Sequence, residues 1–235
     1  MRSPVDNDML AIQWRPQTYS VSVCRLLSLL APAASHMDLN IGAALWLAAR
    51  ATGTLHLPHC HASQPGSMHG RQYSSRARVV LVGHGADELF AGYGRHRSAM
   101  RVGGWPRLQE ELQLDMRRLW WRNLGRDDRI IADCSREARH PFLDEALLVA
   151  VARLPLASVA DLRQPAGMGD KAVLRRVARG LGLARAAGRA KRAIQFGCRI
   201  ANQSNVREFG SNRAANKQKA GSKALDAVVT RADAL

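Results

Sequence analysis

The chain has few aromatic residues, few lysines and few acidic side chains. Aromatic residues make up 5% of its 235 residues, and Lys and Arg together number 35 against 19 Asp and Glu. The resulting net charge of +16 would attract RNA, DNA or anionic lipid non-specifically. The basic residues are overwhelmingly arginines spread along the chain, without a basic stripe interleaved with aromatics, so nucleic acid is not an expected partner.

Long apolar runs and closely spaced cysteines are also missing. No apolar run approaches the roughly 18 residues that a membrane-spanning helix needs, and Asp6 and Asp8 interrupt the amino terminus. We therefore expect no membrane partner and a cytoplasmic location. The cysteines have no close pairing, which fits reduced thiols rather than a disulfide framework. They are Cys24, Cys60, Cys134 and Cys198.

The stretch that organises the chain is a short β-branched run followed by two glycines and two acids. Residues 79–82 predict a strand buried on both faces, ending at the carboxyl edge of a parallel sheet, where ligands bind. Gly83 and Gly85 allow positive φ and a close approach of backbone N–H groups to an anion. Asp87 and Glu88 are placed to hold Mg²⁺ on phosphate oxygens. The simpler alternative is an ordinary strand-to-helix turn whose acids complement the helix dipole.

The pattern on either side of this stretch predicts a mostly helical chain. We expect an irregular segment over 1–17, a domain over 18–201 and a disordered basic tail over 202–235. Within the domain, 54–75 is rich in His, Pro, Ser and Gly, a composition that predicts a flexible insertion. Its histidines match no compact zinc ligand spacing, so a metal site is not expected there. Helices are expected over 21–30, from a cap at Asp38 or Asn40 to Gly53, and over 108–124 with Trp120 and Trp121 as packing residues. Further helices are expected over 141–154, with Leu154 pointing inward, and from a cap at Asp170 to about Gly182.

The organising stretch resembles the G-x-G-[AS]-D-E-x-x-x-G-Y segment of the asparagine synthetase family, in its carboxy-terminal ATP-pyrophosphatase-type domain. Further similar segments follow in order at 126–129, 137–144 and 191–197. Segments 122–129, 94–97 and 195–201 are similar to the branch of asparagine synthetase domain-containing proteins. The resemblance implies an α/β fold, the distal part of a parallel-sheet ATP-pyrophosphatase-like (adenine nucleotide alpha hydrolase-like) domain.

The same resemblance implies ATP-dependent amide formation from aspartate or a related carboxylate, with glutamine or ammonia as nitrogen donor and ATP and Mg²⁺ as cofactors. It assigns Asp87 to the metal and Glu88, Lys191 and Arg192 to catalysis. The residues that it places at the substrate or nucleotide are Gly83, His84, Gly85, Arg129, Glu137 and Arg139.

Two departures from the family pattern limit what can be expected. His84 stands where synthetases carry a glutamate, and an imidazole supplies no fixed negative charge. The family's S-G-G-x-D-S pyrophosphate loop and its amino-terminal Cys nucleophile do not occur in these 235 residues. We therefore expect the carboxy-terminal part of a longer protein, or a truncated gene model, that does not make asparagine by itself. A non-catalytic binding or scaffold module and a basic nucleic-acid-binding protein are the alternatives.

Overall fold

The computed structural model describes residues 9–11, 17–33, 35–56 and 70–200. Its contacts divide the chain into two compact units, and strands β4 (Val79–Leu81) and β5 (Glu137–Arg139) lie at places where the chain passes between them. The first unit comprises Met1–Val80, Arg126–Glu137 and Ile194–Leu235, and the second comprises Leu81–Gly125 and Ala138–Ala193. The candidate site lies in the second unit.

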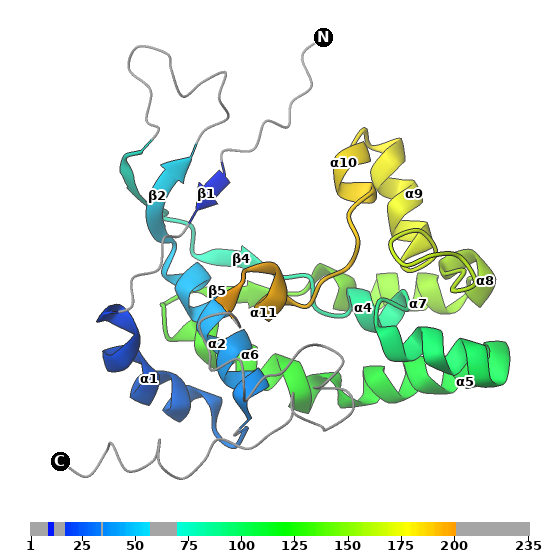
Figure 1. Cartoon of the computed structure of the whole chain (residues 1–235), viewed down its shortest axis with the longest axis horizontal. Coiled ribbons are helices and arrows are strands. Elements are labelled where there is room, and N and C mark those ends of the chain that lie inside the picture. The colour runs from blue at the N-terminus through cyan, green and yellow to red at the C-terminus, as the bar shows by residue number, and fades with distance from the viewer. Residues whose placement is uncertain (1–8, 12–16, 34, 57–69, 201–235) are drawn as a thin grey trace. The chain divides into compact units, whose positions relative to one another are not determined.

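The described part of the chain is mixed α/β and mostly helical, as expected, with two small sheets (Figure 1). The remaining strands are β1 (Met9–Ala11), β2 (Thr52–His56) and β3 (Gln72–Ser74). The helices are α1 (Gln17–Leu30), α2 (His36–Arg50), α4 (Ala86–Leu89), α5 (Gly94–Leu119), a π-helical segment (Trp120–Leu124), α6 (Gly125–Ala132), a 3₁₀ turn (Pro141–Leu143), α7 (Glu145–Ala152), α8 (Leu156–Val159), α9 (Ala172–Gly180), α10 (Ala184–Ala187) and α11 (Ile194–Gly197).

The first unit combines an antiparallel sheet with a small helical core. Strand β2 pairs with β1 on one side and β3 on the other. Helices α1 and α2 lie against each other (Figure 1), and the buried core comprises Leu26, Leu30, Leu39, Ala43, Ile130 and Ile200. The segment expected to be irregular over 1–17 contains strand β1. The ends of the insertion expected to be flexible over 54–75 lie in strands β2 and β3, so both expectations are wrong at these residues. Its centre, 57–69, and the tail expected over 202–235 lie outside the described residues.

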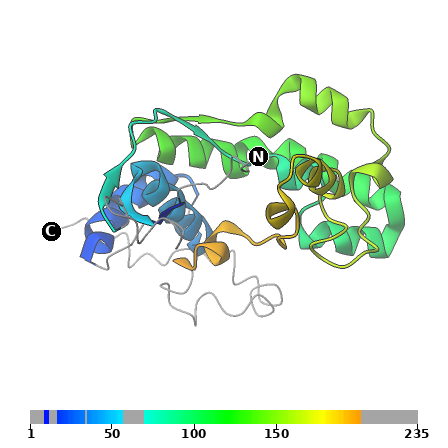
Figure 2. The same cartoon turned by 90° about the horizontal axis from the view of Figure 1, so that it is seen from above.

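The long helix α5 contributes buried residues to the core of the second unit. Leu108 and Leu112 of this helix are buried with Ala91, Ala160 and Leu162. Helix α5 changes direction at Gly103 and Gly104, whose backbone is not helical. Helices α9 and α10, drawn in yellow and gold, pack against each other on the same unit (Figure 2). No helix in the described ranges is both long and apolar enough to cross a membrane.

Several expected buried faces are wrong. Val79 and Leu81 of β4 are 47% and 73% exposed, so this strand is not buried on both faces. Its only sheet partner within the described residues is β5. Trp120 and Trp121, expected to pack, are 68% and 61% exposed and lie in the π-helical segment, none of whose residues is buried. Leu154, expected to point inward, is 43% exposed.

The expected helix caps are also wrong in two places. Ser35, rather than Asp38 or Asn40, caps α2 and accepts a hydrogen bond from the Asp38 N–H. At α9 the capping position is Lys171, in the left-handed conformation at φ 53°, and Asp170 lies one residue before it. The Asp170 carboxylate instead bonds the Arg175 side chain, a charged partner that competes with the orphan N–H groups of the helix.

Candidate functional site

The loop between β4 and α4 has the turn that the motif predicts, built on one of its two glycines. Gly85 adopts φ 90°, and a Cβ there would lie 2.4 Å from Leu143 Cδ2, so both the backbone and the contact require glycine. Of the two glycines that allow positive φ, Gly85 adopts it and Gly83 does not. The Val82 N–H donates to the Arg139 carbonyl at 2.9 Å where β4 ends.

Asp87, in the first turn of α4, is contacted by two lysine ammonium groups. Its Oδ1 lies 2.8 Å from Lys171 Nζ, and its Oδ2 lies 3.6 Å from Lys191 Nζ. The three side chains are 21–23% exposed, so the cluster reaches the solvent. Gly92 makes room for it, since a Cβ there would lie 1.9 Å from Asp87 Oδ1 and 2.7 Å from Lys171 Cε. One carboxylate opposed by two ammonium groups leaves an excess positive charge at this point of the surface.

The Tyr93 ring packs against the ammonium group of one of the two lysines. The Lys191 ammonium lies 4.7 Å from the centre of the Tyr93 ring, and the Arg95 guanidinium lies 4.0 Å from it. The Tyr93 hydroxyl donates a hydrogen bond to Oε1 of the buried Glu88 at 2.6 Å. Burial, followed by the Glu88 carboxylate, raises the pKa of Tyr93 far above its ordinary value, so this hydroxyl stays protonated.

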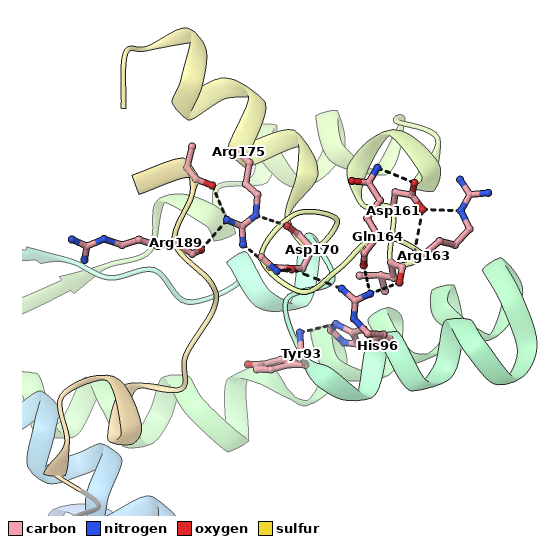
Figure 3. A network of polar contacts seen from close by, with 12 residues as sticks. Tyr93, His96, Asp161, Arg163, Gln164, Asp170, Arg175 and Arg189 are labelled. Carbon is pink, nitrogen blue, oxygen red and sulfur yellow. Dashed lines mark hydrogen bonds and ion pairs between the residues drawn. The ribbon is translucent and has the colours of Figure 1, made fainter. Parts of the chain in front are cut away.

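The Tyr93 backbone is anchored in turn by a buried histidine and a buried carboxylate. The Tyr93 N–H donates to His96 Nδ1 at 3.3 Å, so Nε2 is the ring nitrogen left to donate (Figure 3). That Nε2 lies 2.8 Å from Asp115 Oδ2. Burial works to raise the pKa of Asp115, but hydrogen bonds from His96 and Arg95 hold this pKa below its usual range. The Tyr93 backbone is therefore linked through His96 to the buried Asp115 carboxylate.

The two adjacent basic residues predicted from the sequence differ in whether they contact Asp87. The structure brings Lys191 to Asp87, whereas the next residue, Arg192, is exposed and makes no ion pair with Asp87. Arg139 lies in β5, where its carbonyl oxygen accepts the bond from Val82. His84, between the two glycines, faces His140 with ring centres 5.3 Å apart.

Two other predicted residues belong to the first unit. The Arg129 guanidinium donates to the carbonyl oxygens of Leu29, Leu30 and Ala31, which are orphan acceptors at the carboxyl end of α1. Glu137 begins β5, and its N–H donates to the Arg78 carbonyl at 2.8 Å. The contacts found for Arg129 support a structural role for its side chain.

Lys171 was not predicted from the sequence, although a signal for it exists. Lysine occurs at five of 235 positions, and within the described residues it occurs at 171 and 191 alone. Both of these lysines contact Asp87. In a chain that uses arginine almost everywhere for positive charge, a lysine is a candidate for a position that uses a compact ammonium group.

Comparison with known proteins agrees with these motifs. The model of the asparagine synthase family matches residues 35–103 and 100–232. The chain is 45% identical over 173 residues to asparagine synthetase domain-containing protein 1 of Gallus gallus, covering 74% of this chain and 26% of the relative. It is 41% identical over 194 residues to the Homo sapiens protein of the same name, covering 83% and 29%.

An archaeal relative matches a shorter part of the chain. The putative asparagine synthetase [glutamine-hydrolyzing] 1 of Methanocaldococcus jannaschii is 43% identical over 79 residues, which is 34% of this chain and 15% of that protein. The chain thus spans less than a third of the length of these relatives. With the family model matching most of its residues, the chain belongs to the asparagine synthase family.

Proposed function

We propose that the second unit binds the pyrophosphate part of ATP, as the distal half of a parallel-sheet, ATP-dependent enzyme that forms an amide from aspartate or a related carboxylate. The observation that carries this proposal is the placement of the Lys171 and Lys191 ammonium groups on the single carboxylate of Asp87. Family membership adds the expectation of ATP use.

The charge of the cluster suits a phosphate group. Asp87 carries one negative charge and the two lysines carry two positive charges, so an anion gains a net attraction on arrival. Ammonium groups on flexible stems can leave the carboxylate and contact phosphate oxygens as point charges. As an acyl-adenylate forms, they would neutralise the negative charge that gathers on the departing pyrophosphate.

The same residues fit Mg²⁺ only together with phosphate oxygens. Among the described residues no group of three or more His, Cys, Asp or Glu side chains could hold a metal ion. Mg²⁺ commonly takes one or two carboxylates and completes its shell with substrate phosphates and water. Asp87 would be the carboxylate. Glu88 is buried and accepts a hydrogen bond from the Tyr93 hydroxyl, so its role here is to position the Tyr93 ring beside Lys191. Bound Mg²⁺ would supply charge neutralisation on the phosphates.

Titration of the 235-residue chain with pyrophosphate, with and without Mg²⁺, tests the proposal. The variants are Asp87→Asn, Lys171→Gln and Lys191→Gln, and the control is Arg185→Gln, which removes one positive charge from an exposed position in the same unit. We expect each lysine variant to weaken binding about tenfold or more, as loss of a charged hydrogen bond does.

Asp87→Asn should act differently from the lysine variants. It should abolish the gain in affinity that Mg²⁺ provides while leaving metal-free pyrophosphate binding intact or stronger, because it removes the metal ligand and a competing anion. Absence of saturable binding by the wild-type chain, or equal effects of Arg185→Gln and the lysine variants, would instead favour a non-catalytic module in which Asp87 is a structural ion-pair partner.

A further inference from the structure

The two lysines of the site come from separate segments that need to be held at a fixed spacing. Lys171 immediately precedes α9, and Lys191 follows α10 on an extended stretch. Neither side chain can set the position of the other, because Asp87 is 21% exposed and its contacts are broken when an anion takes the ammonium groups. A structural element other than Asp87 must therefore fix the two segments.

The buried side chain of Arg175 bonds both segments (Figure 3). On the side of Lys171, its Nε donates to the Asp170 carbonyl at 2.8 Å and its Nη2 donates to the Asp170 carboxylate at 2.6 Å. On the side of Lys191, its Nη1 donates to the carbonyls of Ala187 and Arg189 at 2.7 and 2.8 Å. The guanidinium thus joins the residue before Lys171 to the backbone two residues before Lys191.

We propose that Arg175 is a positioning residue that sets the spacing of the Lys171 and Lys191 ammonium groups and thereby selects pyrophosphate over a single phosphate. The selectivity part rests on the proposed function. Two phosphoryl groups need two cations at a defined separation, whereas inorganic phosphate is satisfied by either cation alone. Any change that lets the two segments drift apart lowers affinity for pyrophosphate more than affinity for phosphate.

Arg175 acts through geometry rather than charge. Its positive charge is matched by the Asp170 carboxylate at 2.6 Å, so it contributes little net field to an anion at Asp87. Its planar fork provides several fixed donors, which a lysine cannot reproduce. The burial of Arg175, at 6% exposure, also excludes it from direct contact with a ligand in this conformation.

The backbone at Lys171 shows that this segment is tightly held. Lys171 adopts the left-handed conformation at φ 53°, which costs a non-glycine residue about 1 kcal/mol or more and persists where the surroundings enforce it. Its N–H donates to the Phe90 carbonyl at 2.9 Å. Nearby, Gly169 allows its backbone to lie close to the Asp161 carbonyl oxygen, since a Cβ at Gly169 would lie 1.7 Å from that oxygen.

Arg97 supplies a matched control. Its Nη2 lies 3.9 Å from the same Asp170 carboxylate, but its Nη1 donates to the carbonyl oxygens of Leu162 and Gln164, in a loop without lysine. Arg97→Gln therefore removes an arginine from Asp170 without releasing Ala187 and Arg189. An effect seen in Arg175→Gln but not in Arg97→Gln can therefore be assigned to the loss of the hydrogen bonds to the segment that carries Lys191.

The first measurement needs no ligand. Reductive ¹³C-methylation labels the five lysines of the chain, and Lys191→Arg assigns the signal of Lys191. We expect this signal to be shifted upfield, because Lys191 Nζ lies 4.7 Å from the centre of the Tyr93 ring. Arg175→Gln should abolish the shift and Arg97→Gln should keep it, at temperatures where thermal unfolding shows both variants folded. An unchanged Lys191 signal in Arg175→Gln would overturn the proposal.

The second measurement compares affinities for pyrophosphate and phosphate. Arg175→Gln should lower the pyrophosphate-to-phosphate affinity ratio about tenfold, Arg175→Lys should restore little of it, and Arg97→Gln should leave it unchanged. In a Lys191→Gln background, Arg175→Gln should have no further effect on the ratio.

Equal ratios in wild type and Arg175→Gln, with wild type binding pyrophosphate, would overturn the selectivity claim alone. Failure of the wild type to bind pyrophosphate would overturn the proposed function and the selectivity together, while the ring shift still decides positioning.

Discussion

Gly92 shows how little space surrounds the carboxylate of the site. A Cβ at this position would lie 1.9 Å from Asp87 Oδ1, so Gly92→Ala must displace either Asp87 or Lys171. We expect the variant to lower affinity for Mg²⁺–pyrophosphate at least tenfold and to destabilise the fold by roughly 1–3 kcal/mol, as overpacking does. Calorimetric titration and urea unfolding measure the two effects.

Gly94→Ala is the matched control for that prediction, since nothing lies within 4 Å of a Cβ at Gly94. It should leave the affinity unchanged. Equal affinity in Gly92→Ala and wild type would mean that Asp87 and Lys171 are not fixed in the observed contact.

Asp170 should make the second unit sensitive to acid. Burial works to raise its pKa, but hydrogen bonds from Arg175 and the Gly167 N–H hold the pKa of Asp170 below its usual value. A carboxylate with a lowered folded-state pKa stabilises fully above its unfolded pKa of about 4, and this stability is lost as pH falls through the folded value. Asp170→Asn should therefore lower stability at pH 7 and flatten the loss of stability below about pH 4.

Urea unfolding between pH 2.5 and 7 measures the Asp170 prediction, with Asp161→Asn as the control. Asp161 also has a lowered pKa, from its hydrogen bond with Arg163, but its partner is exposed and its pair is screened by solvent. The same acid slope in Asp170→Asn and wild type would contradict the structural role given to this carboxylate.

The residues of the site were only partly predictable from the sequence. Asp87 could be singled out because its motif is contiguous, with the glycine, carboxylates and tyrosine within a few positions. Lys171 and Lys191 are far from it in the chain, and only the fold shows that both contact it. Between the adjacent bases Lys191 and Arg192, the scarcity of lysine in the sequence favours Lys191. The direction of each side chain depends on the turn that precedes it, which only the structure shows.

At the scale of single elements, α7 depends on the aspartate that ends the Pro-Phe-Leu-Asp segment. The Asp144 side chain accepts from the N–H groups of Ala146 and Leu147, two orphan donors of the helix. Asp144→Ala should cost about 1 kcal/mol of unfolding free energy, as N-cap losses do. Glu145→Ala removes a neighbouring exposed acid without removing a cap, and should cost a few tenths of that. Similar losses in both variants would contradict the capping role.

Element positions were easier to predict than element ends and faces. Apolar periodicity located α1, α2, α7 and α9, because that signal extends over several turns. The caps were wrong because Ser35 and Asp38 are both good capping residues, and the choice between them depends on where the preceding chain arrives. The exposed Trp120 and Trp121 were misassigned because periodicity assumes α-helical rotation, which the π-helical segment interrupts.

For the whole molecule, the division into two units predicts where a ligand acts. Asp87 and the two lysines that contact it belong to 81–125 and 138–193. Mg²⁺–pyrophosphate should therefore slow amide hydrogen exchange in the segments around Asp87, Tyr93, Lys171 and Lys191, and leave the β1–β2–β3 sheet unchanged. Hydrogen exchange with mass spectrometry measures this. Protection confined to the first unit would place the binding site elsewhere.

The central claim is that two lysines and Asp87 form one anion site, and the most direct test is calorimetric titration of Mg²⁺–pyrophosphate into the wild type and a Lys171→Gln/Lys191→Gln variant. The account predicts saturable binding of one pyrophosphate per wild-type chain, and a loss of about 100-fold or more in the double variant if each ammonium contributes about tenfold. The same affinity in the double variant, with both proteins folded, would contradict the account.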